Sequence, residues 1–97
     1  MNFKTNEKGG WIIPGDTTVG SSEIIPAFSE IGENCSFGFG CEFGENCKFL
    51  KYCFFSKDCF FEAGCEFGIS CFFEYNCTFK RGCKFSDLTY DGKIIFL

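Results

Sequence analysis

Cysteine is the residue whose chemistry and spacing dominate this chain. It occurs at every sixth position over a long stretch, at Cys35, Cys41, Cys47, Cys53, Cys59, Cys65, Cys71, Cys77 and Cys83. Thiols can form disulfides, bind zinc or act as nucleophiles. A structural zinc site needs four ligands that converge on one point, and this spacing contains no C-x-x-C pair. We therefore expect no metal site and no cofactor.

A disulfide ladder is the alternative role for these thiols. If the hexads stack in coils, the Cα atoms of Cys35, Cys53 and Cys71 lie about 4.8 Å apart, which is within disulfide range. Three thiols in a ladder leave one unpaired, and burial among aromatic rings lowers the reactivity of each. We expect reduced cysteines that fill a core.

Size, charge and the absence of histidine restrict the function. The chain has 97 residues, which is enough for one domain. It contains no histidine, the usual proton shuttle at neutral pH. Its net charge of -4 provides no cationic field for phosphates. We expect neither an enzyme nor a protein that binds nucleic acid directly.

The N-terminal segment, MNFKTNEKGG, has no apolar signal region. No stretch of the chain approaches the ~18 apolar residues that a membrane span needs. An odd number of cysteines without a secretion signal also argues against a disulfide framework. These observations predict a cytoplasmic protein with no membrane association.

A phenylalanine follows every cysteine by two residues, so each hexad contains Cys-x-Phe. Upstream, the register of the phenylalanines continues as Ile31, Ile25, Val19 and Ile13. Six residues turn an α-helix by about 600°, so a helix would gather these residues on no single face. In a strand, positions i and i+2 share a face. Each Cys-x-Phe therefore predicts a short strand with both side chains inward.

The last residue of a hexad predicts a corner of the chain. It is usually Asp, Asn or Gly, the residue types that tolerate a left-handed backbone. Tyr52, Ser70 and Leu88 depart from this pattern. The predicted corners are at Asp16, Asn34, Gly40, Asn46, Asp58, Gly64, Asn76 and Gly82.

Short strands and regular corners predict an all-β solenoid, because one repeat cannot bury its apolar face alone. Three hexads a coil give a three-sided parallel β-helix of about four coils, roughly 20 Å long. We expect a single domain with an N-terminal cap at 1–12, the solenoid at 13–88, and a strand or hairpin at 89–97. The Asp91-Gly92 pair suits the tight turn of such a hairpin.

The segments Ile31-Gly32-Glu33-Asn34-Cys35 and Phe43-Gly44-Glu45-Asn46-Cys47 resemble the hexapeptide-repeat family of left-handed parallel β-helices. The family pattern is an aliphatic residue, Gly, two variable residues and a small residue, and the resemblance covers about residues 13 to 88. It implies left-handed winding, which is not the usual hand of parallel crossovers. The chain departs from the family by using Phe as the large residue. It also lacks the histidine on which the family's acyltransferases and carbonic anhydrases depend.

One predicted side of the solenoid carries an outward aromatic patch. Its strands present Phe54 and Phe72, and the adjacent corner and side extend the patch. Contiguous exposed aromatic residues commonly mark interfaces. The alternative is that the chain's own termini cover them. The predicted partner-binding residues are Phe39, Phe54, Lys57, Phe60, Phe72 and Tyr75.

Two further surfaces are distinctive. The third side carries an alternating ladder of Lys48, Glu66 and Lys84, which we interpret as a solvated, stabilising face. The apolar C-terminal strand, with Ile94, Ile95 and Phe96, either covers the last coil or pairs with a second copy to form a dimer.

The functional hypothesis is a non-enzymatic protein-binding module that occupies a site on another protein as an inhibitor. Small acidic proteins without catalytic residues are often inhibitors, among them proteins of phages and other mobile elements that block host defence nucleases. Mimicry of DNA is weakened by lysines such as Lys51 and Lys80. The alternative hypothesis is a structural homo-oligomer built from the solenoid.

Overall fold

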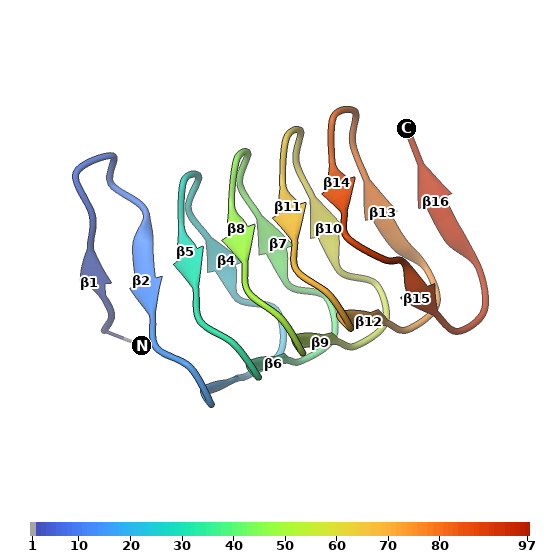
Figure 1. Ribbon diagram of the computed structural model, residues 1–97, viewed down its shortest axis with the longest axis horizontal. Coiled ribbons are helices and arrows are strands. Elements are labelled where there is room, and N and C mark those ends of the chain that lie inside the picture. Colours follow the sequence, from blue (N-terminus) through green and yellow to red (C-terminus); the bar gives the residue numbers. More distant parts are fainter. Residues whose placement is uncertain (1) are drawn as a thin grey trace.

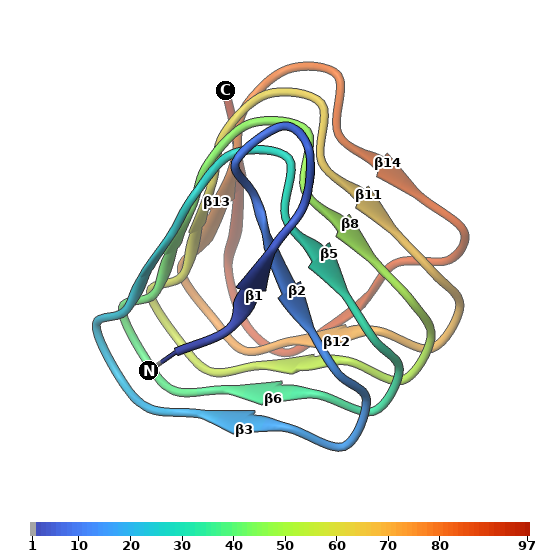
Figure 2. The ribbon, with the colours of Figure 1, turned by 90° about the vertical axis from the view of Figure 1, so that its left-hand side faces the viewer.

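The hexads form short strands that wind into a three-sided parallel β-solenoid (Figure 1). The structure is a computed structural model that describes residues 2–97, and it contains no helix in this range. Viewed from its N-terminal end, the chain follows a triangular outline (Figure 2). The prediction of an all-β solenoid is confirmed.

Each side of the prism is one sheet, and we name the sheets A, B and C. Sheet A contains β1 (Lys4–Thr5), β2 (Trp11–Ile13), β5 (Glu30–Ile31), β8 (Lys48–Phe49), β11 (Glu66–Phe67) and β14 (Lys84–Phe85). Sheet B contains β3 (Thr18–Val19), β6 (Ser36–Phe37), β9 (Phe54–Phe55), β12 (Phe72–Phe73) and β15 (Thr89–Tyr90). Sheet C contains β4 (Ile24–Ile25), β7 (Glu42–Phe43), β10 (Phe60–Phe61), β13 (Cys77–Phe79) and β16 (Ile94–Phe96).

Every third strand along the chain pairs in parallel, which fixes the coil. Phe37 of β6 lies opposite Phe55 of β9, one coil later in the sequence. The sheets together make about five turns, where the sequence predicts about four. The difference arises at the C-terminus, because β15 and β16 continue the winding although the Cys-x-Phe pattern has ended.

Phenylalanine rings fill the interior in three columns. Within a column the rings stack almost in parallel, as Phe43 does on Phe61 with centroids 4.7 Å apart and planes 4° apart. Between columns they meet edge to face, as Phe55 and Phe61 do at 5.1 Å and 86°. Both arrangements suit the ring quadrupole. Ile13, Val19, Ile25 and Ile31 continue the core towards the N-terminus.

The corners adopt the left-handed backbone that the sequence predicts. All eight Asp, Asn and Gly corners have positive φ. Tyr52 and Ser70, which depart from the pattern, also have positive φ, of 64° and 59°. A positive φ strains the backbone of such residues. The strain at Tyr52 and Ser70 persists because the strands on either side are held in register by the neighbouring coils.

The two ends of the solenoid differ. At the N-terminus, β1 pairs antiparallel with β2 and so covers the edge of sheet A. Of the two forms predicted for the C-terminus, strands are present and the hairpin is not: β15 and β16 pair in parallel with β12 and β13. Gly92, with φ of 78°, makes another solenoid corner instead of a hairpin turn.

Candidate functional site

The outward face of sheet B carries the stacked aromatic pair that the sequence predicts. Phe54 of β9 lies directly opposite Phe72 of β12, and their rings stack with centroids 5.6 Å apart and planes 8° apart. Both side chains are half-buried on a face made of paired strands. The terminal strands β1 and β16 lie in sheets A and C, so neither crosses this face.

The corner between sheets B and C extends this aromatic surface. Phe39 is 52% exposed and Tyr75 is 42% exposed, although both are large and partly apolar. Lys57 occupies the same corner position in the coil between those of Phe39 and Tyr75. Its Nζ is 5.8 Å from the centre of the Tyr75 ring. The corner therefore presents two aromatic rings and one cation to solvent.

Phe60 belongs to the neighbouring face. It points outward from β10 in sheet C, where it lies between Glu42 and Thr78. The Nζ of Lys80 lies 6.0 Å from the centre of its ring. The structure thus groups Phe54 with Phe72, places the corner residues beside them, and leaves Phe60 around the corner. We call these six predicted residues together the aromatic face.

The C-terminal residues have divided roles. Ile94 packs against the core opposite Cys77, while Ile95 points outward opposite Thr78. Phe96 stacks on Phe79 with centroids 5.6 Å apart, yet 58% of it is exposed. Because β16 is the last strand of sheet C, its outer edge has no partner strand among residues 2–97.

The thiols line the interior beside the corners. Eight of the nine cysteines are buried, and all nine are free. From Cys41 to Cys83, each Sγ donates to a backbone carbonyl 21 residues earlier, as Cys59 does to Gly38 at 3.5 Å. No group of three or more metal-ligating side chains is found within residues 2–97.

Cys83 differs from the other cysteines. It is only partly buried, because it lies in the last complete Cys-x-Phe hexad. The neighbouring thiol of Cys65 lowers the pKa of Cys83 to about 7 by stabilising its thiolate. The Cys59 thiol likewise lowers the pKa of Cys41 to about 7, but Cys41 is buried, so exposure is what distinguishes Cys83. Burial raises the pKa of the Cys35 thiol.

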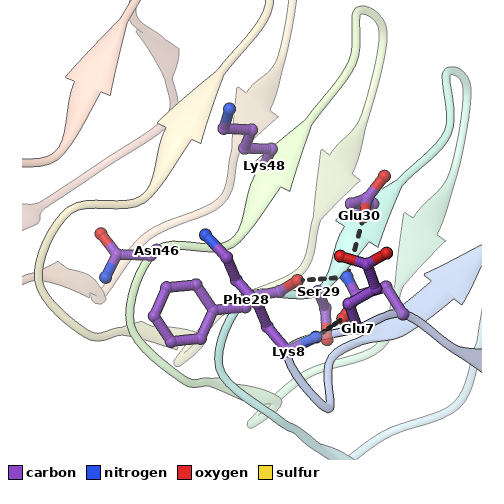
Figure 3. Close-up of a pocket in the computed structure, with 8 residues that line it drawn as sticks. Glu7, Lys8, Phe28, Ser29, Glu30, Asn46 and Lys48 are labelled. Carbon is purple, nitrogen blue, oxygen red and sulfur yellow. Dashed lines mark hydrogen bonds between the residues drawn. The ribbon is translucent and has the colours of Figure 1, made fainter.

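A pocket of about 390 Å³ lies where the N-terminal hairpin meets the corner at Phe28 (Figure 3). Lys8 lies over the Phe28 ring, with Nζ 5.0 Å from its centre. Asn6 donates from Nδ2 to the Phe28 carbonyl and to Glu30, each at 2.8 Å. These polar groups already bind one another, and no buried side-chain nitrogen or oxygen in the described part of the chain lacks a hydrogen bond. The side chains that line the pocket therefore attach the N-terminal hairpin to the first coil.

Sequence analysis missed one exposed apolar group. Leu50, Tyr52 and Ile69 are each about half exposed at the corner between sheets A and B. The available signal was that Leu50 and Tyr52 stand at hexad positions where other corners carry Gly, Asn or Asp, whereas Ile69 stands at a variable position.

Comparisons with known proteins add no relative. No protein-family model matches the chain. Curated proteins contain no match to it. A comparison with solved structures also finds no match. Within residues 2–97, no helix is long and apolar enough to cross a membrane.

Proposed function

We propose that this chain is a non-enzymatic protein-binding module that contacts a partner protein through the aromatic face. The observation that carries the proposal is the stacked pair of Phe54 and Phe72 on a preformed sheet, beside the exposed rings of Phe39 and Tyr75. Aromatic residues dominate the binding energy of protein interfaces. A face built on paired strands also loses little conformational entropy on binding.

In this proposal the module is an inhibitor that occupies a site on its partner. The repeat follows the hexapeptide type, but the chain has no histidine for the chemistry of that family's enzymes. Nine free thiols suit a reducing compartment, so we assign the protein to the cytoplasm. The partner is a protein whose apolar surface accepts a flat aromatic face.

The test is capture of partners by the wild type and by a Phe54→Glu/Phe72→Glu variant. A matched control, Ala27→Glu/Ala63→Glu, adds the same charge at the corner between sheets C and A, opposite sheet B. Circular dichroism checks that all three proteins fold. We expect a protein that is captured by the wild type and the control but not by the Phe variant. The same protein, once purified, should bind the wild type and the control directly and bind the Phe variant much more weakly. Equal capture by both variants would contradict the proposal.

The second candidate is a structural homo-oligomer that associates through β16. The exposed Phe96 ring and the unpartnered edge of sheet C favour it. In sedimentation velocity, we expect Phe96→Glu to abolish self-association if this candidate is correct. A wild type that sediments as a monomer would exclude it.

A further inference from the structure

The outward column of sheet A is a ladder of alternating charge. Glu30, Lys48, Glu66 and Lys84 lie opposite one another in successive coils, and all four are exposed. No ion pair within 4.0 Å joins any of them in residues 2–97, where the one ion pair is between Lys80 and Glu62. Glu30 accepts a hydrogen bond from Nδ2 of Asn6. Lys48, Glu66 and Lys84 have no charged partner within residues 2–97, so their charges are available to groups outside the chain.

The order of the charges is complementary to itself. Consider a two-fold axis that lies in the plane of this face and runs along its strands. Such an axis reverses the order of the coils and keeps each column of residues opposite the same column of the second copy. Glu30 then faces Lys84 of the second copy, and Lys48 faces Glu66. Every row of the ladder meets an opposite charge, and each contact occurs twice.

The next column is complementary in shape under the same operation. It contains Gly32, Leu50, Gly68 and Ser86, which follow the inward residues of β5, β8, β11 and β14. The axis that pairs Lys48 with Glu66 places Leu50 opposite Gly68. Leu50 projects from the surface with 56% of its area exposed, and Gly68 has no side chain. A groove of about 370 Å³ beside Leu50 adds apolar surface from Ile12.

The other faces lack this pattern. The outward column of sheet B carries no charge, and that of sheet C carries only Glu42. The molecule measures 34 × 24 × 23 Å, so one prism face offers at most about 800 Å², close to the area that each partner buries in a standard interface. Sheet A thus has both the size and the charge order for a symmetric contact.

We propose that a second copy of this chain docks on the outward face of sheet A, with the two solenoids antiparallel. Opposite charges across the contact set its register and exclude shifted arrangements. The interface uses neither the aromatic face nor the edge of β16, so it does not rest on the proposed function.

The experiment measures self-association by sedimentation velocity at about 0.05 M and 0.5 M salt. We expect a wild-type dimer that weakens at high salt. Lys48→Glu and Glu66→Lys each place like charges opposite one another twice, and each should weaken the dimer about a hundredfold or more. Lys93→Glu makes the same charge change at the exposed corner between sheets B and C, opposite sheet A, and should leave the wild-type mass unchanged.

Two combinations of variants distinguish charge pairing between two copies from charge pairing between the coils of one chain. An equimolar mixture of Lys48→Glu and Glu66→Lys should form a heterodimer, because each new charge faces its opposite. The double variant Lys48→Glu/Glu66→Lys should recover a homodimer, although its own ladder then has like charges in adjacent coils. A ladder that acts only within the chain predicts no recovery in either case.

Several results would overturn the proposal: a wild type that remains a monomer at about 100 μM, a Lys48→Glu dimer of unchanged affinity, or a mixture that does not associate. Loss of the dimer in Phe54→Glu/Phe72→Glu or Phe96→Glu, with sheet A variants unaffected, would place the interface on those surfaces instead.

Discussion

Each buried phenylalanine has two kinds of ring contact, and this explains why phenylalanine occupies most of the large core positions. Phe61 stacks on Phe43 at 4.7 Å and on Phe79 at 4.9 Å, and it meets the rings of the other two columns edge to face. Such pairs add about 0.5–1.5 kcal/mol each beyond the burial of area. Each ring therefore packs against rings of the coil above, the coil below and its own coil.

Phe61→Ala should lower the free energy of unfolding by about 3–5 kcal/mol, because it opens a cavity in the middle of the stack. Urea denaturation followed by circular dichroism measures this loss. Phe96→Ala is the matched control, since Phe96 is largely exposed at the end of the stack, and it should cost about 1 kcal/mol or less. Equal losses for the two variants would contradict this account of the core.

The cysteines act as small core residues whose thiols have hydrogen-bond acceptors. Cysteine combines an apolar side chain with a weak hydrogen-bond donor. Serine is more polar, and valine donates no hydrogen bond, so neither combines the two properties. The regular bond to a carbonyl of the preceding coil satisfies the weak donor without interrupting the strand ladder.

Native alkylation with iodoacetamide should modify Cys83 and leave the other cysteines unmodified. Cys83 is partly exposed, and its pKa is lowered to about 7 by Cys65. Because the thiolate is the reactive form, the rate should rise as pH increases through about 7 and then level off. Intact-mass and peptide mass spectrometry provide the measurement. Modification of several cysteines at equal rates in the folded protein would refute the prediction, and urea should expose all nine.

At the scale of elements, the side chain of Asn6 makes four hydrogen bonds that help to hold the N-terminal hairpin. Oδ1 of Asn6 accepts from the backbone N–H groups of Lys8 and Gly10, while its Nδ2 donates to Phe28 and Glu30. Gly10 must lack a side chain, because a Cβ there would lie 2.2 Å from the carbonyl oxygen of Phe28. The hairpin therefore joins the first coil through both polar and steric fit.

Asn6→Ala should destabilise this hairpin by about 1–3 kcal/mol, because it leaves backbone groups at Gly10 and Phe28 without partners. Hydrogen exchange should then increase in β1 and β2 and remain unchanged in the central coils. Thr5→Ala, a substitution at an exposed residue of the same hairpin, should have little effect. Unchanged exchange in Asn6→Ala would show that packing of Phe3 on Trp11 is sufficient.

At the scale of the whole molecule, the solenoid is a one-dimensional stack in which each coil contacts only its neighbours. At the N-terminal end, β1 covers the edge of sheet A, while β3 and β4 keep one edge without a partner strand in residues 2–97. The C-terminal end has no added strand and exposes part of Phe85 and most of Phe96. Stability should therefore decrease towards β16.

Hydrogen exchange by mass spectrometry should show the strongest protection in β6 to β11 and the weakest in β15 and β16. The physical reason is that the last coil has strand partners and ring contacts on one side only. Faster exchange in β2 than in β16 would contradict this order. Docking at sheet A would add protection mainly along the corner at Leu50.

Much of the site is readable from the sequence, because outward positions follow directly from the period. The contact of Phe54 with Phe72, and the ladder of Lys48, Glu66 and Lys84, follow once three hexads make a coil. Their degree of burial does not follow, because it depends on the side chains of neighbouring corners. The exposed fraction of Leu50 does not follow either, although a large apolar residue at a position where other coils carry Gly is a local signal of an exposed group.

The sequence by itself determined the strands, the corners and the three-sided coil, because alternation within a strand and left-handed backbone residues are local properties repeated without a slip. Only the tertiary structure decided the two ends. Asp91-Gly92 is locally compatible with a hairpin, but pairing with β12 and β13 offers longer ladders and contact with the ring stack. It also decided that the thiols bond to the preceding coil, since those partners lie 21 residues away.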